Sequence, residues 1–566
     1  MRYKDKVPES KVIDLTDFSK GVFNLPAEMV PAGGFATLDN CEYDPVDNSL
    51  VSCAGLTKKY KATQEARIDS FFYSNVFRTF FFSAGGTLYT TDFITQTTLG
   101  ALTGANPAKF HHFDNYLIIT SGGVLQYYNG TTFKTTLLPT PITITALTHS
   151  GLSATATTGT TAHNLTAGME ITVVGASPDA YNGTFYISSV TDYTFTYTLS
   201  ATPTSDASPV GAYTLVDNRP YLDSVIDREG RLVGTKAGDD YQYYSAIGSF
   251  KDVSSWTNQV SDPSTAQKTR IGYDDSASTV VSAMLSTDAI VFKAPKRAYR
   301  IYGVPGDSGY ATYELSRDID VANNNCVLTV KNNLFIFGQN GFDAIQTVQS
   351  YGSMQLIDPS IAGTWGPFFR QNKDDTCRIW VVASRAQVWI RYNTSGKIAI
   401  YHYNMNAFTF RTFESPVTDI TENGTNVYIV TDNTIYILDE LSSSTETTSI
   451  LAQMELGNLS SITDYIISFY RFALSLKTTE GEAQCIIPNN ANGQDFVIPL
   501  SSSVASPIAF LDTKIAYSNT DPLVYGDQYA TAKAFCNYRA TGFQPKVKVI
   551  SGRFALREMK FKVGNG

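Results

Sequence analysis

The sequence predicts an all-β protein built around a β-propeller of six or seven blades. Three observations lead to this prediction: a hairpin pattern that recurs along the middle of the chain, a composition rich in strand-forming residues, and a near absence of helix-period segments. The chain has 566 residues, among them 34 Tyr and 33 Phe, and aromatic and β-branched side chains favour strands. Hydrophobic residues are 43% and charged residues 17% of the chain, which is typical of folded protein.

The clearest copy of the hairpin is QVWIRYNTSGKIAIYHY, residues 387–403. In each half, successive residues alternate between two sets, as expected when side chains of a strand point to opposite faces of a sheet. The polar turn at residues 393–396 separates the two halves, and an Asn/Ser/Gly turn of this kind joins antiparallel strands. The segment therefore predicts two paired strands.

Six further segments follow the same pattern of apolar strand, Gly/Asn/Asp/Lys turn and second strand. The seven copies start at Asn75, Asp114, Glu229, Thr287, Asn332, Gln387 and Gly424. Most starts lie roughly 37–58 residues apart, the range of a four-stranded propeller blade. The interval from Asp114 to Glu229 is longer by one small domain.

This arrangement predicts five parts. They are an extended, turn-rich N-terminal arm (1–65), a first part of the propeller (66–142), an inserted small β-barrel module (143–213), a second part of the propeller (214–440) and a C-terminal β platform or sandwich (441–566). The insert contains its own short strands, ITVVGA, TFYISSV and YTFTYTL. Lengthening a surface connection costs little closure entropy, so an insertion between strands is tolerated.

Two local features complete the structural prediction. Pro263–Lys268 is the only modest helix candidate. The last strands alternate basic with apolar residues, which predicts one basic and one buried face; the basic residues are Lys546, Lys548, Arg553, Arg557, Lys560 and Lys562.

The net charge of −9 argues against a general nucleic-acid grip, because phosphate binding needs a cationic face. No apolar run approaches a membrane-spanning helix, and the start, MRYKDKVPES, lacks the apolar stretch of a secretory signal. Six single cysteines form neither a disulfide framework nor a zinc motif. We expect them to be buried in a protein made in a reducing cytoplasm: Cys41, Cys53, Cys326, Cys377, Cys485 and Cys536.

A serine-protease arrangement is the most tempting catalytic candidate. His163 and Ser308 occur in the order of chymotrypsin-like enzymes, and a serine nucleophile needs a positioned histidine base. Tyr310 stands where that family has its second glycine, and Asn164 where it has a cysteine. Two turn sequences are the simpler interpretation.

Other candidates are equally well explained as structure. His111 and His112 are adjacent, so in a regular strand they point to opposite faces and do not share a metal; one buried and one exposed histidine is the simpler expectation. The remaining candidates are an incomplete Asp-box-like turn at Ser360–Trp365, loop carboxylates at Asp239–Asp240, Asp274–Asp275 and Asp374–Asp375, and glycosylation-type sequons at Asn129 and Asn423. Phosphate-loop and dinucleotide motifs are absent. We predict no catalytic, metal or cofactor site and no enzymatic activity.

The arm carries a resemblance to a known family. The segments FSKGVF (18–23), VPAGG (30–34), LDNCEYDP (38–45) and the closing Gly55 resemble the N-termini of tail nozzle proteins of short-tailed bacteriophages, also called tail tubular or DNA-stabilisation proteins. Many relatives carry an Arg and a Pro before the last glycine, whereas this chain has Ser52-Cys53-Ala54. The family's propeller core and strand-rich platform match the predicted layout.

The insert carries a second resemblance. Residues 161–176, Tyr181–Phe185 and Phe195–Tyr197 are similar to the small β-barrel module named after the first catalytic cysteine half-domain of ubiquitin-activating enzymes. That module recurs as an accessory in phage structural proteins. The segment contains no cysteine, so no thioester chemistry is carried over, and His163 becomes a residue of a module turn.

The nozzle resemblance implies a structural virion protein of the phage tail, made in the host cytoplasm. It implies a ring, a homohexamer, below the portal and adaptor proteins, which conducts genomic DNA through its lumen during genome ejection without sequence-specific binding and anchors tail fibres or spikes. The alternative is a glycan-binding or glycan-degrading propeller, a tailspike- or lectin-like protein, with Trp256 or Trp365 as an exposed recognition platform. A capsid-decorating or adhesion protein that uses the insert as a binding domain is a third possibility.

Overall fold

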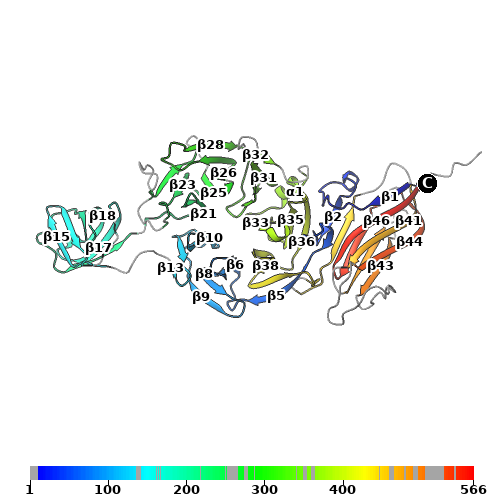
Figure 1. Cartoon of the computed structure of the whole chain (residues 1–566), viewed down its shortest axis with the longest axis horizontal. Helices are drawn as coiled ribbons and strands as arrows, with labels where there is room; N and C mark the ends of the chain where they lie inside the picture. Colours follow the sequence, from blue (N-terminus) through cyan, green and yellow to red (C-terminus); the bar gives the residue numbers. More distant parts are fainter. Residues whose placement is uncertain are drawn as a thin grey trace, which may run out of the picture.

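The computed structural model describes residues 11–565 apart from 135–141, 161, 164, 166, 217, 249, 251–255, 257–264, 273–277, 286, 339–340, 348–353, 358–363, 445–446, 458–464, 477–479, 488–494, 504–527 and 541–543. Within these residues the protein is all-β, with a single short α-helix, α1 (Gly366–Asn372). Figure 1 shows a central ring of sheets between a separate barrel at one end and a strand-rich platform at the other.

Seven four-stranded antiparallel blades form the ring in the described part of the chain. Blade 1 consists of β6 (Ile68–Ser74), β7 (Thr79–Ala84), β8 (Thr87–Thr91) and β9 (Gln96–Ala101). Blade 2 consists of β10 (Lys109–Phe113), β11 (Tyr116–Thr120), β12 (Gln126–Tyr128) and β13 (Phe133–Lys134). Blade 3 consists of β21 (Ser224–Arg228), β22 (Arg231–Thr235), β23 (Tyr241–Tyr244) and β24 (Gln267–Arg270).

Blades 4 and 5 are β25 (Ser278–Leu285), β26 (Asp288–Ala294), β27 (Arg297–Tyr302) and β28 (Ala311–Ser316), then β29 (Val327–Val330), β30 (Asn333–Gly338), β31 (Gly341–Thr347) and β32 (Met354–Ile357). Blades 6 and 7 are β33 (Arg378–Val382), β34 (Gln387–Arg391), β35 (Lys397–His402) and β36 (Ala407–Thr412), then β37 (Val417–Asn423), β38 (Asn426–Thr431), β39 (Thr434–Asp439) and β5 (Gly55–Lys61). The predicted propeller is confirmed, with seven blades.

Each predicted hairpin is the middle pair of strands of one blade. The segment at residues 387–403 contains β34 and β35, which pair with Trp389 opposite Ile400. Trp389 is fully buried and belongs to one hydrophobic cluster with Val427 and Ile429 of blade 7. Its side chain therefore packs one blade against the next.

The ring is closed by a strand from the N-terminal region. β5 pairs antiparallel with β39 and supplies the outer strand of blade 7. Blades 7 and 1 also meet near the axis, where the Phe71 amide donates a 2.7 Å hydrogen bond to Asp419 Oδ2. Closure thus joins segments that lie more than half the chain apart.

The insert between blades 2 and 3 is a small β-barrel with its own core, as predicted. Its seven strands are β14 (Ile142–Thr143), β15 (Ala146–Ser150), β16 (Ser153–Thr157), β17 (Glu170–Ala176), β18 (Gly183–Val190), β19 (Thr194–Thr198) and β20 (Val210–Leu215). Tyr181, Phe195, Tyr197 and Tyr213 are buried in its centre. The first strand pairs with the last, so the chain enters and leaves the barrel side by side.

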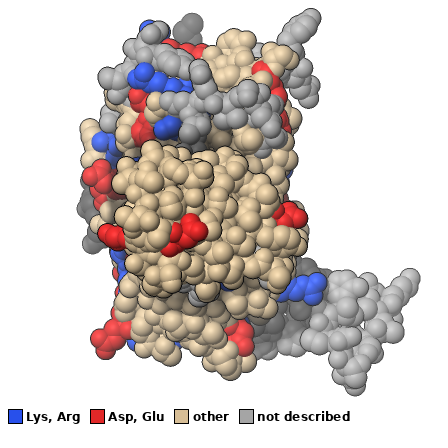
Figure 2. All heavy atoms as spheres, turned by 90° about the vertical axis from the view of Figure 1, so that its left-hand side faces the viewer, with Lys and Arg blue, Asp and Glu red and all other residues tan. Residues whose placement is uncertain are grey.

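The insert carries almost no positive charge. The sequence has no Lys or Arg between Lys134 and Arg219. Figure 2 looks at this end of the molecule; its central part shows mainly uncharged residues with a few acidic groups, and Lys and Arg appear toward the edges of the view. This surface does not attract phosphates.

The platform is made of two sheets that share one hydrophobic core. One sheet holds β1 (Lys11–Leu15), β3 (Cys41–Tyr43), β4 (Leu50–Ser52), β41 (Tyr465–Leu476), β44 (Gln528–Ala540) and β46 (Phe554–Asn565). The other holds β2 (Phe35–Asp39), β40 (Ala452–Leu456), β42 (Glu480–Ile487), β43 (Phe496–Ser503) and β45 (Lys546–Ser551). The described residues of the N-terminal arm thus supply strands to both platform sheets and to blade 7.

Strand β2 makes the platform continuous with the propeller. It pairs with β40 on one side and, in parallel through Asp39 and Phe410, with β36 of blade 6 on the other. Blade 6 and one platform sheet therefore form a single sheet of nine strands.

Two local predictions are wrong. Residues 267–268 of the expected helix lie in β24, because this segment pairs with β23 as the outer strand of blade 3. The expected single basic face is wrong, because β45 and β46 lie in different sheets. Within β45 alone the expected alternation holds, since Lys546 and Lys548 alternate with the buried Val547 and Val549. Arg553 is 4% exposed, and Lys546 Nζ lies 2.8 Å from Glu455 Oε1.

Candidate functional site

The innermost strands of all seven blades line a cavity of about 530 Å³ on the propeller axis. One residue from each blade in turn is Phe71, Lys109, Ser224, Ser282, Leu328, Arg378 and Asp419. Polar and charged groups are held at fixed positions on this wall.

Asp419 ties three blades together at one side of the cavity. Its buried carboxylate accepts hydrogen bonds from Trp380 Nε1 at 2.7 Å, Arg378 Nη2 at 2.8 Å and the Phe71 amide at 2.7 Å. The charge is paired and its oxygens are satisfied, so this carboxylate has a structural role.

Lys109 crosses the cavity from blade 2. Its Nζ donates a 2.6 Å hydrogen bond to the carbonyl of Asn324, in the segment that leads into blade 5. Burial and the nearby Arg378 lower the pKa of Lys109 to about 7. The contact with Asn324 joins the inner strand of blade 2 to the segment before blade 5, so the Lys109 side chain obstructs the propeller axis.

The two adjacent histidines are both half-buried, rather than one buried and one exposed. His111 lines the cavity, and burial lowers its pKa to about 4. His112 lies 3.2 Å through Nε2 from Ser74 Oγ. Among the described residues, neither histidine has a carboxylate partner that would make it a general base.

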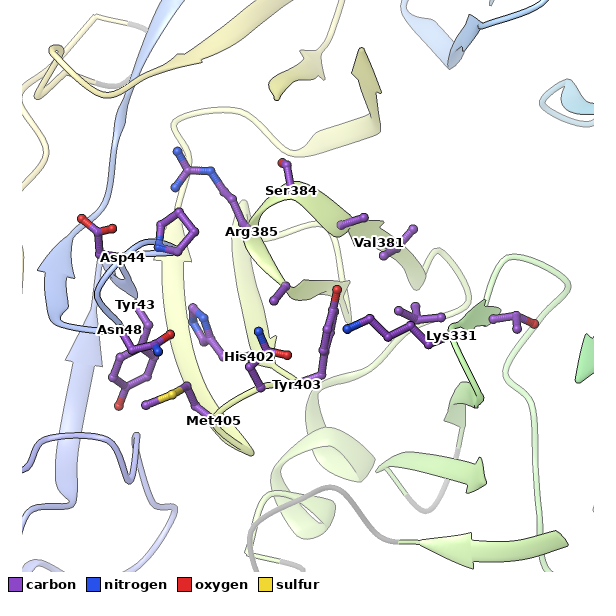
Figure 3. Close-up of a pocket in the computed structure, with 16 residues that line it drawn as sticks. Tyr43, Asp44, Asn48, Lys331, Val381, Ser384, Arg385, His402, Tyr403 and Met405 are labelled. Atoms are coloured by element: carbon purple, nitrogen blue, oxygen red, sulfur yellow. The ribbon is translucent and has the colours of Figure 1, made fainter. Parts of the chain in front are cut away.

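A second cavity of about 460 Å³ lies where the β3–β4 hairpin meets blades 5 and 6. Figure 3 shows Tyr43, Asp44 and Asn48 of the hairpin on one side and Lys331 on the other, with His402 and Tyr403 between them. Burial lowers the pKa of His402 to about 3. The imidazole is therefore neutral, with Nε2 2.9 Å from Thr409 Oγ1.

Beside this cavity is a set of charges that we call the junction cluster: Glu42, Arg385, Arg411, Glu440 and Arg553; Glu440 is exposed and the other four are buried. Glu42 lies on β3 of the arm and is fully buried. Its carboxylate accepts hydrogen bonds from Arg385 Nη1 at 2.9 Å, Arg553 Nη2 at 3.3 Å and the Ala54 amide at 2.8 Å. Arg385 belongs to blade 6 and Arg553 to the platform, so one carboxylate joins three parts of the chain.

The other members complete the cluster. Glu440, at the end of blade 7, pairs with both Arg385 and Arg553. Arg411 Nη2 donates to the Ala54 carbonyl at 2.7 Å. Burial alone would raise the pKa of Glu42, but the guanidinium groups of Arg385, Arg553 and Arg411 hold it at about 2.

Two glycines of the arm allow its close approach to the propeller. Gly21 has φ +72, and a Cβ there would lie 2.8 Å from the Ala407 Cβ of blade 6. A Cβ on Gly55 would lie 2.3 Å from Ser442 Oγ. Both positions therefore require glycine.

The protease arrangement is excluded by position. His163 lies in the inserted barrel, where Nε2 is 3.1 Å from the Thr194 carbonyl and Nδ1 accepts a hydrogen bond from the Leu165 amide. Ser308 lies in the loop between β27 and β28 of blade 4.

The loop carboxylates are engaged locally. Asp239 Oδ2 accepts a 2.7 Å hydrogen bond from Tyr243, and Asp240 lies 3.0 Å from Arg270 Nη2. Asp374 and Asn129 accept hydrogen bonds from nearby turn residues. Asp274–Asp275 and Ser360–Gly363 lie outside the described residues.

The expected exposed tryptophan platform is wrong. Trp256 is 4% and Trp365 6% exposed. Trp365 Nε1 donates a 2.9 Å hydrogen bond to the Val22 carbonyl and so holds the arm against the propeller.

No sequence motif indicated the junction cluster or Lys109 directly. The available signal was a charged residue in an apolar strand, as in Cys41-Glu42-Tyr43. Among the described residues no group of three or more His, Cys, Asp or Glu side chains is arranged to hold a metal ion. No helix in that part of the chain has the length and apolarity needed to cross a bilayer.

Comparison with known proteins identifies no family and finds distant structural neighbours. No protein-family description and no curated protein matches the sequence. Among solved structures, BamB from Moraxella catarrhalis is 7% identical, with a TM-score of 0.34, over 77% of this chain and 98% of BamB. Sqt1 from Saccharomyces cerevisiae is 10% identical, with a TM-score of 0.33, over 68% of this chain and 98% of Sqt1. Phage phi92 endosialidase is 12% identical, with a TM-score of 0.24, over 82% of this chain and 77% of the endosialidase. The assignment as a β-propeller rests on the strand pairing itself.

Proposed function

We propose that this protein is a structural subunit of a phage tail, without enzymatic activity, which forms the ring-shaped nozzle at the exit of the DNA channel. The observation that carries the proposal is the role of residues 18–55, the segment with the nozzle resemblance. Strand β2 in this segment links blade 6 to the platform, and Glu42 lies at the centre of the junction cluster. The segment thus acts as the connector between two rigid bodies, as a scaffold requires.

The obstructed axis of the propeller supports a DNA channel that lies outside the propeller. Because Lys109 spans the axis to Asn324, DNA would pass through a central lumen enclosed by the ring of subunits, and not through a propeller. A ring, for which the family suggests six copies, provides that lumen below the portal and adaptor.

The net charge of the chain favours a channel through which DNA slides rather than a surface that binds DNA. A net charge of −9 repels phosphates and favours a DNA strand that slides, whereas a cationic wall would bind it. The insert, with no Lys or Arg, suits the outside of the ring, where fibres or spikes attach.

Mass measurement of the purified protein tests the proposal. We expect a ring of several copies, either alone or on addition of the portal–adaptor complex, and a central hole in electron micrographs. A strict monomer at micromolar concentration that stays monomeric with portal and adaptor would contradict the proposal. A panel of polysaccharides tests the alternative, since a glycan-active propeller would bind or cleave one of them.

A further inference from the structure

Two cysteines face each other across the boundary between blades 5 and 6. Cys326 directly precedes β29 and Cys377 directly precedes β33. Their sulfur atoms lie 3.5 Å apart, and both residues are buried. A disulfide would need the sulfurs to approach by about 1.5 Å.

Local hydrogen bonds hold the pair in place. Cys326 Sγ donates to the Cys377 carbonyl at 3.3 Å. The side-chain Nδ2 of Asn323 donates to the same carbonyl at 2.9 Å and lies 3.5 Å from Cys377 Sγ. Both thiols therefore have a defined orientation toward each other.

The two thiols differ in their readiness to ionise. The hydrogen bond from Cys326 lowers the pKa of Cys377, and Lys373 and Arg391 lower it further. Burial raises the pKa of Cys326. Because the thiolate is the attacking species in disulfide exchange, Cys377 is the nucleophile of the pair.

The residues next to each cysteine in the chain lie at a surface from which a small reagent could reach the thiols. Asp375 and Thr376, next to Cys377, are exposed, and Asn324 and Asn325, next to Cys326, line the axial cavity. Local opening of the turn before β33 would expose Cys377 without unfolding either blade.

We propose that Cys326 and Cys377 are a reversible cross-linking site that forms a disulfide when the protein leaves a reducing compartment. The Cys377 thiolate attacks a small-molecule disulfide and releases one of its halves as a thiol. The Cys326 thiol then loses its proton and displaces the other half, which also leaves as a thiol. One disulfide of the reagent is reduced to two thiols, and the two cysteines are oxidised to one disulfide.

The cross-link would close a loop that contains the whole of blade 5 and α1 (Gly366–Asn372). It would fix both ends of this segment beside the axis of the propeller. A disulfide of this kind stabilises mainly by restricting the unfolded chain.

The test compares the full-length protein after incubation with oxidised or reduced glutathione, with free thiols blocked before unfolding. We expect the oxidised protein to lose the mass of two hydrogen atoms, to give a digest peptide that joins Cys326 to Cys377, and to melt at a higher temperature. Cys326→Ser and Cys326→Ala remove the mass change and the melting shift. Cys485→Ser, at a buried cysteine of the platform, retains both.

A parallel incubation in urea below the unfolding transition ensures that the turn opens during the experiment. If both thiols remain free there, if they keep glutathione as separate mixed disulfides, or if either joins another cysteine, the proposal is overturned.

Discussion

Glu42 is the residue on which the connection between propeller and platform depends most directly. Its side chain is fully buried and faces Arg385 and Arg553 at hydrogen-bonding distance. Removing one partner of a buried ion pair leaves uncompensated charge in a region of low dielectric constant. A neutral substitution at this position therefore removes the carboxylate with which the arm faces both the propeller's Arg385 and the platform's Arg553.

We predict that Glu42→Gln lowers the free energy of unfolding by about 3–5 kcal/mol. Differential scanning calorimetry would show the first unfolding transition at a lower temperature. Asp47→Asn is the matched control, because Asp47 also pairs with an arginine, Arg557, but at the surface; its effect should stay within about 1 kcal/mol. Equal effects of the two substitutions would contradict the role of the cluster.

The same carboxylate predicts a dependence on pH. Its pKa falls from 4.5 to about 2 on folding, so the unfolded chain binds the proton more tightly than the folded one. The stabilisation is fully present above pH 4.5 and is lost as the pH falls toward 2. Melting temperatures measured across this window should converge for the native protein and Glu42→Gln at the acid end; a constant difference would refute the assignment.

At the scale of elements, the sequence predicts what is local. The alternation in residues 387–403 identifies β34 and β35, because the two strands are consecutive and joined by a short turn. The short inner strands are harder to recognise: β10 reads Lys-Phe-His-His-Phe and shows no apolar alternation. Closure by β5 was not predictable, since its partner β39 lies far along the chain.

For the candidate sites too, local features could be predicted from the sequence, whereas features that join distant segments could not. Turns such as the one at Asp374 were recognised from local sequence, whereas the junction cluster joins residues from the arm, the propeller and the platform. The helix expected at residues 263–268 fails because strand pairing with β23 outweighs local helix preference at residues 267–268.

We predict that ring closure through β5 is required for stability. Leu56 on β5 is 5% exposed and packs in the cluster that also holds Trp380 and Val427. Leu56→Ala should cost about 2–5 kcal/mol, and limited proteolysis should then cleave near blade 7. Leu441→Ala, at a leucine that is 78% exposed, should change stability by no more than about 0.5 kcal/mol. Indistinguishable melting and cleavage of the two variants would exclude a closing role for β5.

At the scale of the whole molecule, the insert is an independent unit. It has its own core, and its terminal strands β14 and β20 pair with each other. Replacing residues 142–215 with a short Gly-Ser linker should therefore leave the propeller folded, since the ends to be joined already lie together. We expect the first melting transition to shift by only a few degrees and the mass of the assembly to fall by the mass of the deleted segments alone. Loss of the propeller transition would show that the barrel supports the blades.

The final prediction concerns DNA. The axial cavity is spanned by Lys109, the insert has no Lys or Arg, and the whole chain carries a charge of −9. Because an acidic chain releases few counterions from DNA, the assembled protein should bind duplex DNA more weakly than about 10⁻⁴ M at physiological salt. Fluorescence anisotropy of a labelled duplex between roughly 50 and 200 mM salt would measure this. Tight binding with a steep salt dependence would identify a wall that grips phosphates, which a channel for sliding DNA must avoid.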